Sequence, residues 1–478
     1  MGAPKASAQA TVVAPVRLAD SRVVDADALP AQWWRLYRQP ALDAQVAEAL
    51  ANNRDLRAAE AHLLAARAIL RGAVAAQLPA TTVSAGAGDG STLQDQIAAA
   101  SSGSDKVRTG PRFDVGGDLS WELDLFGRLR SAVRAARADA EASAALEDDV
   151  RVAVAADVTG AWLNACGAAH QLEAARRSLA VAERGRDLAE RLDAAGAGSP
   201  IEVMRAEALV EQVRASLPGL DAARHDALVE LAVLSGRPPT DIPSEAEACV
   251  RTPSLDMAPP IGDGAALLRR RPDVRAAERR LEAGAARVGV ATADLYPRIS
   301  LNGGAAISSP TVAGLGARDN LVWRIGPLLS WSIPNLSVAR ARIAQARAGE
   351  AADLAGFDAV ILTALKEVNQ AAQDYGAALD RRAALAAAAR QCARADEALR
   401  LQRLAGAATA LEALDAERAD VDAQAALAAA DTAVAAAQVR LFKALGGGWE
   451  NAPAVSLAPA QRPLSIADPA ARIGVMIP

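Results

Sequence analysis

The chain has 478 residues, of which 51% are hydrophobic and only 3% aromatic, and its formal net charge is −5. Alanine is the most frequent apolar residue, and it favours helices that pack closely. We therefore expect thin layers of helices rather than a wide globular core. Acidic and basic residues are mixed along the chain, which argues against nucleic-acid binding, because that function usually needs a basic face.

Three cysteines, Cys166, Cys249 and Cys392, form no CxxC pair. Their odd number and spacing predict neither a disulfide framework nor a zinc site. No apolar run reaches the roughly 18 residues of a transmembrane helix, and residues 1–5 carry no signal-peptide hydrophobic region. Composition thus leaves two alternatives. The protein is cytosolic, or the sequence is a trimmed mature form that now begins at a new start codon.

The sequence contains two similar halves. DLRAAE at 55–60 returns as DVRAAE at 273–278, an offset of 218, and LSW at 119–121 returns at 329–331, an offset of 210. Such matches in constant order are typical of an internal duplication. The drop of eight in the offset predicts an insertion or deletion between the two matches.

Each half contains a long stretch without proline. Residues about 128–193 and 338–404 predict helices roughly 100 Å long, at 1.5 Å per residue. In the second stretch, eight apolar residues advance 25 positions in seven steps, from Leu354 to Leu379. That spacing is typical of coiled-coil-like packing, although an ordinary amphipathic helix would also show it.

Both long stretches end at glycines and are followed by a helix-start signal. Ser199 and Glu202, and likewise Thr409 and Glu412, have the spacing of a capping box. Each half is therefore predicted to contain a long helical hairpin.

Polar and apolar residues alternate without error between Asp114 and Leu125, which predicts a strand. One face of it carries four carboxylates, and burying unpaired charges is costly, so that face must meet water. Three further strands are predicted at 299–307, 323–333 and, more weakly, 83–87. Strands of this kind suit a transmembrane β-barrel, although a half-buried soluble sheet is the commoner source of the pattern.

Four strands cannot enclose a water-filled pore, and their edges would be exposed. Several chains that each give four strands to one barrel would remove this difficulty.

These patterns occur together with short motifs in a specific order, at 33–34, 40–43, 53–56, 121–128, 271–278, 293–297, 414–418 and 443–449. In them the sequence resembles the TolC-like outer-membrane efflux proteins, in the often-lipidated branch that works with resistance–nodulation–division pumps. Branch members commonly begin at a lipid-modified cysteine. The first cysteine here is Cys166, so we expect no acylation of the chain as it stands.

The resemblance implies a mainly α fold with a transmembrane β-barrel. It implies a homotrimer whose twelve-stranded barrel takes four strands from each chain, with a helical tunnel in the periplasm and a mixed equatorial region. The implied function is a passive exit duct in the bacterial outer membrane. Small molecules would reach it from an inner-membrane pump of the resistance–nodulation–division type and a periplasmic adaptor (membrane fusion) protein.

On this basis we expect nine segments. They are an N-terminal equatorial segment (1–40), a helix of the first repeat (41–78), barrel strands one and two (79–126), the first helical hairpin (127–236), an equatorial linker (237–261), a helix of the second repeat (262–295), barrel strands three and four (296–334), the second helical hairpin (335–446) and a C-terminal equatorial segment (447–478).

The resemblance also implies a periplasmic gate at the tip of the second hairpin, carried by Leu411 and Asp415 and more weakly by Glu412. Three copies around an axis would form narrow apolar and anionic rings. Glu412 has an alternative role as the third residue of a capping box. The repeat mate of Asp415 is Arg205, so the two tips differ in charge, and Arg205 is a possible gate partner.

Trp121, Trp323 and Trp331 are candidates for aromatic residues at the lipid interface, although packing against the equatorial layer would also explain them. No phosphate loop, nucleophile elbow or metal-spaced histidine cluster is present in the sequence, so we predict no enzyme, no cofactor and no metal. A cytosolic helical scaffold would explain the hairpins but not a strand with a wet acidic face. A self-contained porin would need more than four strands.

Overall fold

The computed structural model describes residues 30–255, 270–317, 320–331 and 336–450. The chain divides into two compact units. One, mainly residues 64–142 and 277–357, carries a sheet. The other comprises residues 12–63, 143–276 and 358–478, and its described part is helical. Of the expected segments, 1–40, 237–261, 262–295 and 447–478 lie partly outside the described residues, as does the end of the fourth strand.

Two long helices occupy the proline-free stretches, and this prediction is confirmed. α4 spans Arg128–Ala194 and α10 spans Leu336–Leu404, 67 and 69 residues respectively. At 1.5 Å per residue each is about 100 Å long. Among the predicted seam residues of α10, four are buried, namely Phe357, Ile361, Val368 and Tyr375.

By length and composition alone, α4 and α11 (Ala410–Ala444) each contain a stretch apolar enough to cross a membrane. These stretches are 78% and 50% buried within the protein. Since core helices have the same composition, this is weak support for a membrane helix.

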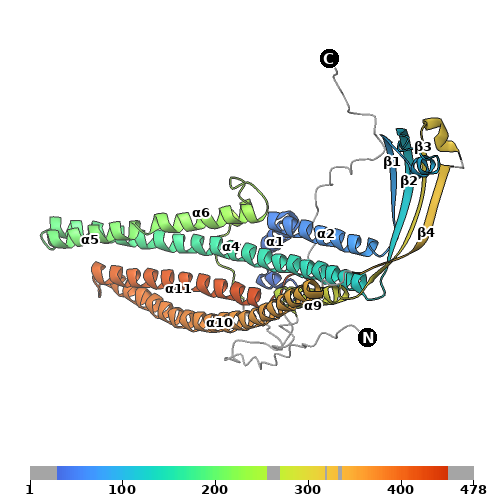
Figure 1. The fold of residues 1–478 in the computed structure, drawn as a ribbon. Helices are drawn as coiled ribbons and strands as arrows, with labels where there is room; N and C mark the ends of the chain where they lie inside the picture. The colour runs from blue at the N-terminus through green and yellow to red at the C-terminus, as the bar shows by residue number, and fades with distance from the viewer. Residues whose placement is uncertain (1–29, 256–269, 318–319, 332–335, 451–478) are drawn as a thin grey trace, which may run out of the picture. The chain divides into compact units, whose positions relative to one another are not determined.

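In the helical unit, α5 (Pro200–Arg214) and α6 (Leu217–Leu234) lie along α4, and α11 lies along α10 (Figure 1). Both hairpin turns use a glycine in the left-handed region, Gly196 with φ 72° and Gly406 with φ 75°. Both predicted capping boxes are confirmed. The Ser199 hydroxyl accepts the Glu202 amide, and the Glu202 carboxylate accepts the Ser199 amide at 3.1 Å.

Replacing Ser199 with alanine is expected to destabilise the first turn of α5 by about 1 kcal/mol, because the Glu202 amide loses its acceptor. The measurement is hydrogen exchange, which should become faster at Glu202 and its neighbours. Ser199→Thr keeps the hydroxyl and should exchange like the unmodified chain. Equal rates in all three proteins would contradict the capping role.

The returning arm of the first hairpin is broken, which was not predicted. α5 ends at Arg214 and α6 begins at Leu217, with Pro218 in the first turn of α6. A proline at 218 has no amide hydrogen to bond the Arg214 carbonyl, and its ring disfavours a continuous helix there. The second hairpin has no proline at this point and returns as one helix, α11.

The first expected helix is also divided, into α1 (Pro40–Asn52) and α2 (Arg54–Ala75). Asn53 lies at the break, and its side-chain oxygen accepts the amides of Asp55 at 2.9 Å and Leu56 at 3.0 Å. A short helix, η1 (Trp33–Tyr37), precedes α1 and starts the main core. There Trp33 stacks on Phe442 of α11, with ring centroids 4.6 Å apart.

The sheet has four antiparallel strands in the order β1-β2-β3-β4, which lie side by side in Figure 1. They are β1 (Ala80–Gly90), β2 (Gly110–Leu123), β3 (Arg298–Ser309) and β4 (Leu321–Ser330). The helix α3 (Leu93–Ser101) lies in the first hairpin loop and η2 (Val312–Gly316) in the second. Loop 91–109 is eight residues longer than loop 310–320, which explains the change of offset between the repeats.

The expectation of no disulfide was wrong. Cys166 of α4 is bonded to Cys249, which follows the short helix α7 (Ser244–Glu247). The two cysteines are 83 residues apart in sequence, so no local spacing could indicate the pairing. Only Cys392 remains a free thiol.

Candidate functional site

The sheet has one polar and one apolar face, because side chains alternate along each strand. On the polar face, Asp118 of β2 lies opposite Gly304 of β3, which in turn lies opposite Arg324 of β4. The Asp118 carboxylate and the Arg324 guanidinium form an ion pair of 3.1 Å across the glycine. A Cβ at position 304 would lie 2.6 Å from the Asp118 carboxylate, so glycine makes room for this pair.

The apolar face is exposed to a degree unusual for a protein surrounded by water. The exposed fractions are 81% for Val83, 70% for Trp323 and 64% for Ile325. Such a contiguous apolar surface is typical of an interaction with protein or membrane. The two outer strands, β1 and β4, each have a second edge with no partner strand among the described residues.

The three candidate interface tryptophans differ in their surroundings. Trp323 and Trp331 are 70% and 48% exposed. Trp121 is half-buried, and its indole N–H donates to the Gln77 carbonyl at 2.9 Å. Because this bond already satisfies the polar end of Trp121, Trp323 and Trp331 are the stronger candidates for contact with lipid.

The strand alternation was expected to continue to Leu125, but β2 ends at Leu123. Asp124 leaves the strand because it caps α4, where its carboxylate accepts the amides of Leu129 at 3.1 Å and Arg130 at 2.8 Å. Leu125 is therefore placed in the turn, 61% exposed.

The tip of the second hairpin presents Leu411, 62% exposed, and Asp415, also exposed. Residues four apart lie on the same side of a helix, so the two side chains share one face of α11. Glu412 is committed to the cap, since its carboxylate accepts both the amide and the hydroxyl of Thr409 at 2.8 Å. Both bonds lower the pKa of Glu412, and the bond from the Thr409 amide has the larger effect.

Arg205 is exposed on α5. Among the described residues it forms no ion pair with Asp415 within this chain. The ion pair nearest the tip that joins the two hairpins is instead Arg184 of α4 with Glu417 of α11. Sequence analysis missed it, because it joins helices whose registers only the fold determines.

A carboxylate cluster lies between α10 and α11. Burial raises the pKa of Asp396, and the neighbouring Glu417 and Asp420 carboxylates raise it further. Carboxylates beyond those predicted from sequence therefore lie near the tip, with Arg184 and Arg400 as neighbouring cations.

Comparisons with known proteins agree with this architecture. The family profile described as "Outer membrane efflux protein" matches residues 46–237 and 265–447, which correspond to the two halves of the repeat. Outer membrane protein OprJ of Pseudomonas aeruginosa is 33% identical over 84% of this chain and 83% of its own length. The toluene efflux pump outer membrane protein TtgF of Pseudomonas putida is 32% identical over 88% of this chain and 86% of its own length.

Solved structures are similar as well. The outer-membrane channel OprN has a TM-score of 0.81 and 34% identity, covering 90% of this chain and 95% of the channel. The open state of the MtrE channel of Neisseria gonorrhoeae has a TM-score of 0.75 and 28% identity, covering 86% of this chain and 90% of the channel. The chain therefore belongs to the outer membrane efflux protein family, and it is a bacterial outer-membrane exit duct of tripartite efflux with its helices in the periplasm.

Proposed function

We propose that three copies of this chain close one twelve-stranded barrel. The observation that carries the proposal is the sheet itself, with four strands, two open edges, one polar face and one exposed apolar face. In a closed barrel every edge strand gains a partner, the polar faces line water and the apolar faces meet lipid. Channels of this family are trimers, which supports the same arrangement.

The test is size-exclusion chromatography with light scattering on protein extracted in mild detergent. The expected protein mass is that of three 49.1-kDa chains, and removal of detergent should cause aggregation, because the apolar faces would meet water. A soluble monomer without detergent would contradict both the trimer and the lipid-facing sheet.

Within this trimer, the gate is proposed at the tip of the second hairpin. Leu411 and Asp415 share one exposed face of α11, so three copies would form an apolar ring next to an anionic ring. Glu412 is a weaker candidate, because its carboxylate is bound to Thr409. Arg205, the charge-reversed repeat mate of Asp415, is proposed as a partner supplied by a neighbouring chain.

Trp323 and Trp331 are proposed to contact lipid near the ends of the strands, with Trp121 in a supporting position.

The partners proposed are a periplasmic adaptor and an inner-membrane pump of the resistance–nodulation–division type. Relatives with nearly equal identity are named for toluene efflux and for pyoverdine export. Since cargoes so different go with similar ducts, we infer that the pump selects the cargo and that this chain conducts small molecules passively.

A further inference from the structure

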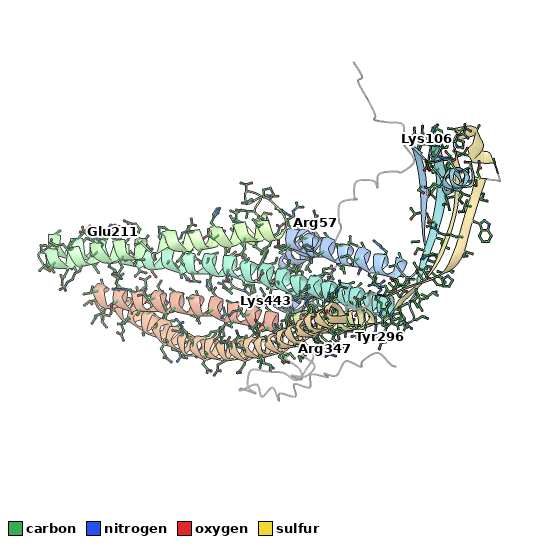
Figure 2. All side chains as sticks on the ribbon, viewed as in Figure 1. Arg57, Lys106, Glu211, Tyr296, Arg347 and Lys443 are labelled. Atoms are coloured by element: carbon green, nitrogen blue, oxygen red, sulfur yellow. A yellow bond between two sulfur atoms is a disulfide. The ribbon has the colours of Figure 1, made fainter. Side chains whose placement is uncertain are left out.

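A cavity lies where the sheet meets the helices, and neither the duct nor its gate uses it. It has a volume of about 930 Å³ and is lined mainly by the start of α4 and the end of α9 (Pro272–Ala293). Figure 2 labels Tyr296 there, just before β3 begins. The Tyr296 ring stacks nearly parallel on Phe126, with centroids 4.7 Å apart.

Three arginines of α4 line this cavity, Arg130, Arg134 and Arg137. Their spacing of four and three residues places them on one face of the helix. No lining residue is acidic. Arg130 is paired with Asp124 at 3.3 Å, whereas the bond that Arg134 forms among the described residues is to the Ser131 hydroxyl, at 3.1 Å. For Arg137, no ion pair occurs within the described part of the chain.

The carboxylates of the same junction are engaged elsewhere. Glu122 binds Arg128 at 2.6 Å, Asp294 binds Arg298 at 2.8 Å and Asp139 binds Arg287 at 2.7 Å. The cavity therefore combines an uncompensated positive charge with an apolar and aromatic wall. This combination suits a ligand with an anionic group and an adjoining apolar part.

The position of the cavity favours a lipid over a neighbouring copy. α4 follows β2 and α9 precedes β3, and these are the two inner strands of the sheet. A neighbouring chain would pair with the outer strands β1 and β4, whereas every lining residue except Gln77 belongs to a segment that adjoins an inner strand. Gln77, which lines the cavity, accepts the indole N–H of Trp121, a residue of the apolar sheet face. In the barrel proposed above, on which this inference rests, the cavity thus belongs to the side that meets the membrane.

Because the strands cross the outer membrane and the helices lie in the periplasm, the junction lies at the level of the periplasmic leaflet headgroups. We propose that this cavity binds the phosphate of an anionic phospholipid from that leaflet. Arg134 and Arg137 hold the phosphate, and Leu125 and the Phe126–Tyr296 pair lie beside the upper part of the acyl chains. Arg130 contributes charge while it remains bonded to Asp124.

The test is native mass spectrometry of the full chain, released from nanodiscs that contain equal amounts of phosphatidylglycerol and phosphatidylcholine. The unmodified protein should retain phosphatidylglycerol preferentially. Arg134→Gln with Arg137→Gln should lower the retained ratio of the two lipids about tenfold, because each arginine near a membrane surface contributes attraction to anionic lipid. Arg134→Lys with Arg137→Lys keeps the charge and should retain most of the preference.

The matched control is Arg67→Gln with Arg71→Gln on α2. Both arginines are exposed, neither lines the cavity, and the change in charge is the same. If this control lost the preference for phosphatidylglycerol to the same extent, the preference would come from general surface charge, and the proposed site would be wrong. Unchanged retention in the Arg134/Arg137 glutamine variant would overturn it as well.

Two further outcomes are decisive. If millimolar inorganic phosphate displaced the lipid as completely as phosphatidylglycerol in excess, the cavity would be a site for free anions and not for lipid. If the glutamine variant failed to assemble, the single variant Arg137→Gln would replace it, with an expected fall of about threefold. An unchanged ratio in that assembled variant would overturn the proposal.

Discussion

Removal of the Cys166–Cys249 disulfide is expected to lower the melting temperature of the detergent-solubilised protein by several degrees. Cys166 is fully buried in the core beside α11, and Cys249 lies in the segment between the two repeats. A bond that closes a loop of 83 residues restricts the unfolded chain, which is worth about 4 kcal/mol in the chain-entropy account. The bond also fixes the segment around α7, in which Ala246 is buried in the core and Ile242 and Leu255 are only partly buried against it.

The measurement compares the unmodified chain with Cys166→Ala plus Cys249→Ser, because alanine suits a buried apolar position and serine a half-buried one. Adding a reductant to the unmodified chain should produce a similar shift. Cys392→Ser, which changes the free and half-buried thiol, should leave the melting temperature nearly unchanged. If the double variant melted like the unmodified protein, the bond would have no stabilising role.

Local patterns in the sequence predicted the elements that local physics determines. The alternation around Trp121 predicted a strand because side chains on a strand have a period of two. The absence of proline from 128 to 193 and from 338 to 404 predicted two long helices. Ser199 and Thr409 predicted the helix starts because a hydroxyl there replaces a missing carbonyl acceptor.

Contacts between distant segments could not be predicted in this way. The bond of Cys166 with Cys249 and the ion pair of Arg184 with Glu417 depend on which helices pack together. The spacing of Arg130, Arg134 and Arg137 was visible in the sequence, but the surface that they face was not. The break before α6 had a signal in Pro218, which sequence analysis did not use.

The gate residues remain a proposal, and the structure sharpens how they can be tested. Leu411 and Asp415 are exposed side by side on α11, and each has a repeat mate on α5. The mate of Leu411 is Ile201, 60% exposed, and the mate of Asp415 is Arg205. The molecule therefore contains an internal control, an exposed apolar residue at the equivalent place on the other hairpin.

Single-channel recording in planar bilayers should separate the two rings. Leu411→Ala removes three large apolar side chains from the proposed constriction, so its conductance should rise. Asp415→Asn keeps the size of the side chain but removes three negative charges. A carboxylate at about 4 Å attracts a monovalent cation by about 1 kcal/mol even in water. The potassium-to-chloride permeability ratio, read from the reversal potential in a salt gradient, should therefore fall about fivefold.

The controls distinguish a gate from a general change at the tips. Ile201→Ala removes a similar apolar side chain from the first hairpin and should leave conductance close to that of the unmodified channel. Glu412→Gln should weaken the cap that Thr409 and Glu412 form, and so speed amide exchange at the start of α11, with little effect on the permeability ratio. If Leu411→Ala and Asp415→Asn both conducted and selected ions like the unmodified channel, the constriction would lie elsewhere. Asp415 would then be a charge that stabilises the start of α11 by its position near the helix N-terminus.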